Sequence, residues 1–275
     1  MDIRILNNKL SNMANSQTLR QPLTVVKVGG AVVEDASQLA VLLDSFSRIQ
    51  GYKILVHGGG RSATKIAAAL GIESKMVGGR RVTDAEMLRV VTMVYGGLVN
   101  KNVVAQLQAR GENAVGLTGA DMDVIRSHKR PVKDVDYGFV GDVDRVDAAV
   151  LASMMNQGAT PVMAPLTHDG QGHMLNTNAD TIAAETAKAM AQTFDVTLVY
   201  AFEKKGVLAD PDDDSSVIRH INKEEYARLK SQGAIAGGMV PKLDNAFSAI
   251  EAGVSRVAIT ANTDLTVDEG TIISE

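Results

Sequence analysis

The sequence predicts an α/β fold in which helices cover both faces of a mainly parallel sheet. Along its 275 residues, short runs rich in β-branched residues alternate with longer segments whose apolar residues recur at helical spacing. This alternation is typical of parallel sheets, because each return to a parallel strand needs a crossover, usually a helix. Glycine-rich or polar motifs follow several of the expected strands, and ligands bind at the carboxyl ends of strands in such sheets.

The elements expected in the first half follow from apolar spacing and from the glycines that interrupt it. Leu39, Leu42 and Phe46 recur every three or four residues, whereas the β-branched run ending at Val28 is typical of a strand. We expect strands at 23–28, 53–56, 81–83 and 114–117, and helices at 35–50, 62–70 and 85–110, the last bent at Gly96 and Gly97.

The second half continues the alternation after a polar, glycine-punctuated stretch that is typical of hairpins. In the last expected helix, Leu243, Phe247 and Ile250 form the buried stripe. We expect strands at 124–128, 139–146, 160–164, 196–200, 256–260 and 271–274, and helices at 147–156, 180–192, 223–232 and 240–252.

The composition is that of an ordinary globular protein, with 45% hydrophobic residues and a net charge of −4, which argues against a general nucleic-acid binder. The chain has no cysteine, so the fold depends on no disulfide, and a reducing cytoplasm is the expected compartment. No apolar run reaches the ~18 residues of a membrane span. Residues 1–20 are polar and indicate a loosely docked N-terminal arm rather than a signal peptide.

A lysine stands inside the first expected strand, and two glycines follow it. A lysine in an apolar strand is costly to bury without an anionic partner, so Lys27 indicates an anion nearby. Gly29 and Gly30 allow backbone N–H groups to face a phosphate at the start of a helix. A snorkelling lysine before a tight turn is the alternative, and this motif alone does not decide between them.

A glycine triplet, Gly58 to Gly60, follows the second expected strand. It permits close approach of the backbone to a ligand, although a flexible turn uses the same residues. His57 directly precedes the triplet, and we expect a structural histidine there rather than a base.

Two further motifs open helices. Asn178 is expected to cap a helix, and Asp180 is favourable in the first turn of that helix. Capping does not explain Asn176, which comes two residues before the cap. Lys242 stands in the first turn of another helix, where a cation is unfavourable unless an anion lies close. Lys27 and Lys242 would then be two cations on one phosphate group, with Asp180 between them.

Motifs of other enzyme classes are missing from the sequence. It contains no G-x-x-x-x-G-K-[ST] loop, no G-x-S-x-G elbow and no H-E-x-x-H motif. The five histidines lack metal-ligand spacing, and His168 and His173 flank residues 169–172, which look like a hairpin turn. Hydrolase and metalloenzyme functions therefore have little support, and no metal ligand is predicted.

Six motifs in order resemble those of the amino-acid kinase family, from about Val25 to the C-terminus. They are Lys27–Gly30, His57–Gly60, Arg81–Asp84, Phe139–Gly141, Asn176–Asp180 and Gly237–Lys242. Each motif is weak alone, but six in the family's order form a specific signal. The resemblance implies an open three-layer α/β/α sandwich on a mainly parallel eight-stranded sheet. It also implies an N-terminal lobe at about 21–177 for the acylated amino acid and dimerisation, and a C-terminal lobe at about 178–275 for the nucleotide.

The resemblance implies a role for each matching residue. Lys27 and Lys242 would neutralise the transferring phosphoryl group, and Asp180 would orient them. The implied phosphate donors are Gly29, Gly30, Gly59 and Gly60, and the implied substrate ligands are Gly59, Gly60, Arg81 and Asn176. The implied nucleotide-binding residues are Glu203, Lys205, Gly206, Val207, Leu208 and Gly237.

The implied reaction transfers a phosphoryl group from ATP, with Mg²⁺, to the side-chain carboxylate of N-acetyl-L-glutamate, in arginine biosynthesis. A carboxylate with a pKa near ~4.3 is already ionised at neutral pH, so the reaction needs positioning and charge neutralisation rather than a base. The alternative of another class is a non-catalytic sensor of nucleotide or amino acid. The presence of Lys27, Asp180 and Lys242 together argues against it.

The chain departs from the family pattern at four positions. Glu203 stands where an aspartate is usual, and Ala120 where a lysine is usual. Arg61 replaces a small or apolar residue, and Arg80 replaces a leucine. The two arginines suggest the hypothesis that the acyl group carries its own carboxylate, as in N-succinyl-L-glutamate. The alternative is that both guanidinium groups point to solvent.

Arginine-inhibited members of the family resemble one another in an amphipathic N-terminal helix and in a tyrosine after the strand lysine. Here Val28 follows Lys27, and residues 1–20 are polar. We therefore expect a homodimer without arginine feedback.

Overall fold

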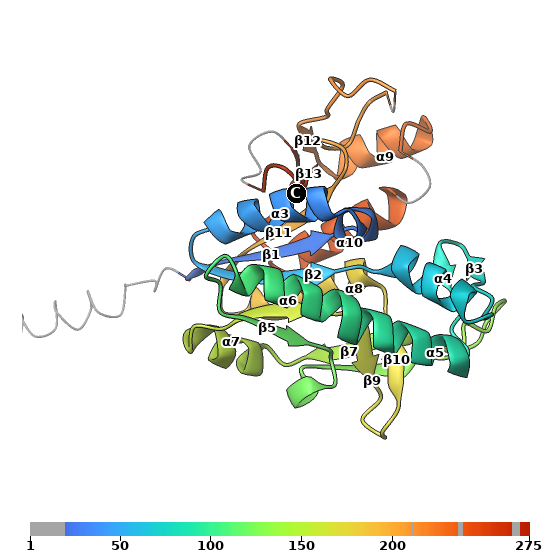
Figure 1. Ribbon diagram of the computed structural model, residues 1–275. Helices are drawn as coiled ribbons and strands as arrows, with labels where there is room; N and C mark the ends of the chain where they lie inside the picture. Colours follow the sequence, from blue (N-terminus) through green and yellow to red (C-terminus); the bar gives the residue numbers. More distant parts are fainter. Residues whose placement is uncertain (1–19, 211, 236–238, 266–269) are drawn as a thin grey trace, which may run out of the picture.

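One sheet of eight strands forms the centre of the molecule (Figure 1). The computed structural model describes residues 20–210, 212–235, 239–265 and 270–275, so nearly all of the predicted N-terminal arm lies outside the described residues. The strands are β1 (Pro22–Val28), β2 (Tyr52–His57), β5 (Ala114–Leu117), β8 (Thr160–Met163), β11 (Asp195–Phe202), β12 (His220–Ile221), β13 (Arg256–Ala261) and β14 (Thr271–Ile273).

The sheet has the order β12-β14-β13-β11-β1-β2-β8-β5. Neighbouring strands run parallel except β13 and β14, which are antiparallel. The predicted mainly parallel eight-stranded sheet is therefore confirmed. Because β1 lies between β2 and β11, the sheet runs without a break through both predicted lobes.

Helices cover both faces of the sheet, because successive strand residues point to opposite sides. Val26 and Val28 pack into a core with one set of helices, and Val25 packs into a core with the other. The first set is α2 (Gly30–Glu34), α3 (Ala36–Arg48), α4 (Gly60–Ala69), α5 (Ala85–Val91), the π-helical segment η1 (Thr92–Val99) and α6 (Asn100–Gln108). The second set is α7 (Ala148–Asn156), α8 (Ala179–Met190), α9 (Lys223–Ser231) and α10 (Met239–Glu251).

The helix predicted at 85–110 differs from expectation, because its middle third is the π-helical η1. The predicted bend residues lie inside this segment. A Cβ on Gly96 would lie 3.4 Å from Cδ1 of Leu166, so the glycine lets η1 pack closely on the neighbouring strand region. Single π-helical turns occur often at functional sites, and η1 carries Tyr95 toward the cleft described below.

A second, four-stranded sheet has the order β10-β9-β6-β7. Its strands are β6 (Ile125–Lys129), β7 (Gly141–Val146), β9 (Leu166–His168) and β10 (Met174–Asn176). The antiparallel pairing of β6 with β7 and of β9 with β10 confirms the predicted hairpins at 124–146 and around 169–172. A further hairpin pairs β3 (Met76–Val77) with β4 (Arg80–Arg81).

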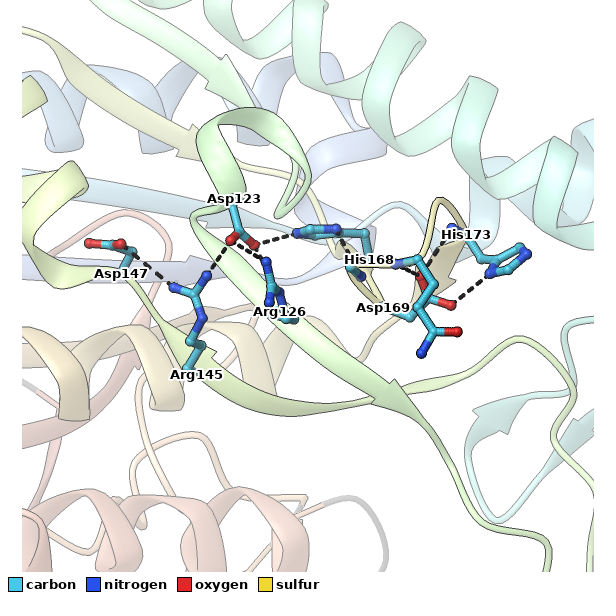
Figure 2. Close-up of polar contacts among 9 residues, drawn as sticks. Asp123, Arg126, Arg145, Asp147, His168, Asp169 and His173 are labelled. Atoms are coloured by element: carbon cyan, nitrogen blue, oxygen red, sulfur yellow. Dashed lines mark hydrogen bonds and ion pairs between the residues drawn. The ribbon is translucent and has the colours of Figure 1, made fainter.

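Ion pairs connect the smaller sheet to the 3₁₀ turn η2 (Asp121–Asp123) (Figure 2). The Asp123 carboxylate pairs with Arg126 of β6 at 2.5 Å, with Arg145 of β7, and with Nε2 of His168 at 2.7 Å. His173 contacts Asp169 across the β9–β10 turn at 2.7 Å. Both histidines therefore serve the geometry of this sheet. No helix among the described residues is long and apolar enough to cross a membrane.

Candidate active site

A cleft opens at the carboxyl ends of β1, β2 and β11, where a parallel sheet binds its ligands. Its larger cavity, of about 500 Å³, is lined by residues from these strand ends and from the starts of α2, α4 and α10. An adjoining cavity of about 180 Å³ shares Gly59, Gly60 and Arg81 with it and extends toward the smaller sheet. All six predicted phosphate- and substrate-binding residues, Gly29, Gly30, Gly59, Gly60, Arg81 and Asn176, line one of these two cavities.

A carboxylate lies between two ammonium groups beside the larger cavity. Asp180 Oδ1 lies 2.7 Å from Nζ of Lys27, and its Oδ2 lies 3.2 Å from Nζ of Lys242. Three elements bring these groups together: β1, the first turn of α8 and the first turn of α10. Asn178 caps α8 as predicted, with its side chain accepting from the N–H groups of Asp180 and Thr181.

The protonation of this group is set by burial and mutual charge. Burial and the nearby Lys242 lower the pKa of Lys27, and the Asp180 carboxylate partly offsets them. Burial acts to raise the pKa of Asp180, but the charges of Lys27 and Lys242 outweigh it and hold that pKa below its ordinary value. Two amino groups and one carboxylate thus meet beside the cavity.

Two glycine loops touch each other at the floor of the cleft. A Cβ on Gly58 would lie 3.0 Å from the backbone N of Gly30, so a larger residue would push the loops apart. Gly30, Gly59 and Gly60 stand at the starts of α2 and α4, where helices leave N–H groups without intrahelical partners. The expectation for Gly29 needs correction, because its N–H donates to the Ala201 carbonyl at 3.3 Å and so continues the β1–β11 ladder.

His57 contacts the backbone of the glycine triplet that follows it. The imidazole is fully buried, and its Nδ1 lies 2.7 Å from the Gly58 carbonyl oxygen. Its Nε2 lies 3.1 Å from Nδ2 of Asn100, whose amide also donates to the Val162 carbonyl at 2.9 Å. Burial lowers the pKa of His57 to about 4, so the neutral ring donates to Gly58 and accepts from Asn100. The structural role predicted for this histidine fits these contacts.

His57 is expected to make the fold sensitive to acid. Its pKa is about 4 in the folded chain against an ordinary 6.5, so stability is lost as the pH falls from 6.5 toward 4. The loss over that window is about 3 kcal/mol in the free energy of unfolding. Urea unfolding of wild type and His57→Gln at pH 7, 5.5 and 4.5 measures it. The variant should lose less stability over this window, and equal losses in the two proteins would contradict the assignment.

Arg81 and Asn176 both line the smaller cavity. The Arg81 guanidinium is buried and donates to the Gly60 carbonyl at 2.8 Å, to Thr64 Oγ1 at 2.9 Å and to Ser74 Oγ at 2.7 Å. Within the described part of the chain, no acceptor is bonded to its Nε. Asn176 donates from Nδ2 to Thr83 Oγ1 at 2.9 Å. Arg81 thus holds α4 in place and offers Nε to an anion.

The residues predicted to contact the nucleotide differ in their surroundings. Glu203 lines the larger cavity, whereas Lys205 is exposed and is not among the residues that line it. Gly206, Val207 and Leu208 are buried and line neither cavity, because the Val207 N–H donates to Thr271 Oγ1 at 2.8 Å and Leu208 pairs with Val217. The nucleotide-binding role implied for these three residues stays a prediction. Gly237 lies outside the described residues.

Two tyrosines that sequence reasoning missed also line the cleft. The Tyr95 ring packs on the second glycine loop, since a Cβ on Gly59 would lie 2.9 Å from its Cδ1. The Tyr200 hydroxyl is buried at the larger cavity and has no hydrogen-bond partner among the described residues. Burial raises the pKa of both phenols, so they stay neutral. A polar residue near the end of an apolar strand was the available signal for Tyr200.

The two additional arginines both reach the cleft. Arg61 lines the larger cavity from the first turn of α4 and is exposed. Arg80 is half-buried on β4 and lines the smaller cavity. Arg80 is thus less exposed than Arg61, and the role of both arginines stays a prediction.

Two lysines on one carboxylate, with N–H groups of two helix starts facing the same cleft, form a site for a transferring phosphoryl group rather than for a hydrolytic nucleophile. This fold and site are those of a small-molecule phosphotransferase. The chain belongs to the amino acid kinase family, whose sequence model matches residues 22–261. The predicted family is thus confirmed.

The chain is similar to relatives that carry one activity in their names. It is 67% identical over 257 residues to an acetylglutamate kinase of Phocaeicola vulgatus, covering 94% of this chain and 100% of the relative. It is 66% identical over 259 residues to an acetylglutamate kinase of Bacteroides fragilis, covering 94% and 99%. A solved structure of carbamate kinase from Giardia lamblia bound to AMP-PNP has the same fold. It has a TM-score of 0.66 at 15% identity, and the match covers 94% of this chain and 99% of that one.

Proposed function

We propose that this chain catalyses the ATP-dependent phosphorylation of the side-chain carboxylate of N-acetyl-L-glutamate, a step of arginine biosynthesis. The observation that carries the proposal is the Lys27–Asp180–Lys242 group beside the cleft. The names of relatives at 66–67% identity support the choice of acceptor. In this proposal Arg81 and Asn176 bind the α-carboxylate and the backbone of the acceptor in the smaller cavity.

The chemistry follows from the charges that meet in the cleft. An oxygen of the ionised side-chain carboxylate attacks the γ-phosphorus of ATP, the bond from that phosphorus to the bridging oxygen breaks, and ADP leaves with the electron pair. No proton moves in this step, so the site needs no general base. Lys27, Lys242 and the N–H groups of Gly30, Gly59 and Gly60 neutralise charge on the oxygens of the transferring group.

Asp180 holds both lysines in position, since each ammonium group pairs with one of its oxygens. Glu203 also lines the larger cavity, and we propose that the nucleotide binds at that end. We propose that Mg²⁺ enters as part of the MgATP substrate, because the described residues contain no group of three or more His, Cys, Asp or Glu side chains that could hold it. We further propose a cytoplasmic homodimer, and the exposed Met93 and Leu98 of η1 favour a partner surface there.

Formation of an acyl phosphate tests the proposal. The protein is incubated with ATP, Mg²⁺, N-acetyl-L-glutamate and hydroxylamine, which traps an acyl phosphate as a hydroxamate. We expect hydroxamate that depends on both ATP and the acceptor, and little from free glutamate or aspartate. Binding of ATP without any hydroxamate would replace the proposal with a non-catalytic nucleotide sensor.

A further inference from the structure

The backbone of Gly58 is fixed on both sides, and this sets the direction of the next peptide group. Its N–H donates to the Val28 carbonyl at 3.2 Å, and its carbonyl oxygen lies 2.7 Å from Nδ1 of His57. The peptide between Gly58 and Gly59 is trans, so its C=O and N–H groups point in opposite directions. Because the carbonyl is turned to the buried imidazole, the Gly59 N–H points away from that ring.

The Gly59 N–H is available to a ligand in the cleft. Gly59 lines both cavities, and its N–H has no hydrogen-bond acceptor in the part of the chain that the structure describes. A Cβ on Gly30 would lie 3.5 Å from this nitrogen, so the group lies beside the start of α2. Lys27 and Lys242 line the same larger cavity. A donor placed here stabilises charge on a phosphoryl oxygen only when it is aimed at that oxygen.

The contact with Gly58 requires one of the two neutral forms of His57. A neutral imidazole carries its proton on either nitrogen, and only a proton on Nδ1 can be donated to the Gly58 carbonyl. Nδ2 of Asn100 lies 3.1 Å from Nε2 of His57, and because that amide nitrogen is a donor, Nε2 must accept. Burial lowers the pKa of His57 to about 4, so the ring is neutral at pH 7. Asn100 therefore places the proton on Nδ1.

The side-chain amide of Asn100 is itself held in one orientation. Its Nδ2 donates to the Val162 carbonyl at 2.9 Å, and its Oδ1 accepts from Nζ of Lys101 at 3.0 Å. Gly116 leaves space for this arrangement, because a Cβ there would overlap Asn100 Oδ1. The flipped amide would set its oxygen against the Val162 carbonyl and its NH₂ group against the Lys101 ammonium group. Residues outside the cleft thus determine where His57 carries its proton.

We propose that Asn100 fixes the tautomer of His57 and that His57 aims the Gly59 N–H at the transferring phosphoryl group. Both are positioning residues of the reaction, since His57 and Asn100 are buried and line neither cavity. Neither side chain moves a proton in the transfer. The inference rests on the proposed function, because it concerns the same phosphoryl transfer.

Two substitutions of His57 separate the donor on Nδ1 from the rest of the ring. Asparagine can place its NH₂ group where Nδ1 stands, so His57→Asn keeps a donor for the Gly58 carbonyl and loses the contact with Asn100. Glutamine reaches toward the position of Nε2, so His57→Gln keeps the contact with Asn100 and loses the donor. His57→Gln should lower the kcat of hydroxamate formation at least about tenfold, because misplacing a group at the reacting atoms costs up to about 10²-fold. His57→Asn should retain most of the wild-type kcat.

Two controls show whether the effect is confined to the transfer step. ADP lacks the transferring phosphoryl group, so calorimetry should give the wild-type Kd for ADP in both His57 variants. His168 also contacts nearby backbone, since its Nδ1 accepts from the Gly170 N–H at 3.2 Å, but it lines neither cavity. His168→Gln should therefore keep the wild-type kcat.

The tautomer is measured directly in the wild-type protein. Nitrogen-15 NMR of the imidazole nitrogens at pH 7 should show a protonated Nδ1 and an unprotonated Nε2 for His57, whose signals are identified by their loss in His57→Asn. Asn100→Leu should lower kcat in the wild-type background and have little further effect in His57→Asn, where no tautomer has to be fixed. Losses that multiply in the double variant would overturn the role of Asn100.

The outcomes separate this inference from the proposed function. Equal losses of kcat in His57→Asn and His57→Gln, no loss in either, or a proton on Nε2 in wild type overturns the inference and leaves the proposed function standing. If wild type forms no hydroxamate, the proposed function fails and the inference fails with it.

Discussion

Replacing Lys27 with methionine is expected to lower kcat by about 10²- to 10³-fold, the usual effect of removing one group that stabilises charge in a transition state. Methionine keeps the length of the side chain but removes the ammonium group that pairs with Asp180 at 2.7 Å. Lys242 remains beside Asp180, so that carboxylate keeps a partner and the fold should persist. Single-turnover kinetics with saturating MgATP and acceptor measure the loss in the chemical step.

Lys53 provides a matched control for the loss of a buried lysine. It is buried, it pairs with Glu112 at 2.7 Å, and it lies outside the cleft. Lys53→Met should cost about 3–5 kcal/mol in the free energy of unfolding, because Glu112 is left without its charge partner. The kcat of the folded fraction should stay at the wild-type value. A fall in kcat of similar size in both variants would show that Lys27 acts through stability alone.

Asp180→Asn is expected to lower activity and to shift its pH dependence toward acid. In wild type the Asp180 carboxylate raises the pKa of Lys27 against burial and against the charge of Lys242. Without that carboxylate the pKa of Lys27 falls further, so the lysine loses its proton at lower pH. The descending alkaline limb of kcat should therefore move to lower pH, and the activity deficit should be larger at pH 8.5 than at pH 6.5.

Glu112→Gln is the corresponding control, since it removes the carboxylate partner of Lys53 outside the cleft. This variant should unfold more easily while its alkaline limb stays in place. Parallel pH profiles for wild type and Asp180→Asn would contradict the role of Asp180 in holding the charge of Lys27.

The sequence predicted the sheet well, because β-branched runs such as the one ending at Val28 have few other stable arrangements. The pairing of Asp180 with two lysines was also predictable, since buried charges need partners. The π-helical η1 was not predicted, because the apolar spacing at 85–110 indicated one bent α-helix and the deviation accompanies close packing of Gly96 on Leu166. Such a contact is set by tertiary structure.

The sequence also could not show which backbone N–H groups are free to bind a ligand. Motifs place Gly29 and Gly30 side by side, but only the ladder between β1 and β11 shows that the Gly29 N–H is already used. The burial of Val207 likewise depends on Thr271, which lies far along the chain. The environment of Arg80 depends on Arg130 and Asp142, which pair across the smaller sheet region. In each case a partner distant in sequence decides the role.

The identity of the phosphorylated carboxylate tests the central claim most directly. Borohydride reduces an acyl phosphate to an alcohol and leaves free carboxylates intact, so mass spectrometry of the reduced product shows which carboxylate was activated. Reaction of the protein with MgATP and N-acetyl-L-glutamate should give the derivative with the alcohol at the side-chain end and the α-carboxylate intact. An alcohol at the α-carbon end, or unreduced acceptor despite ADP release, would contradict phosphoryl transfer to the side-chain carboxylate in this cleft.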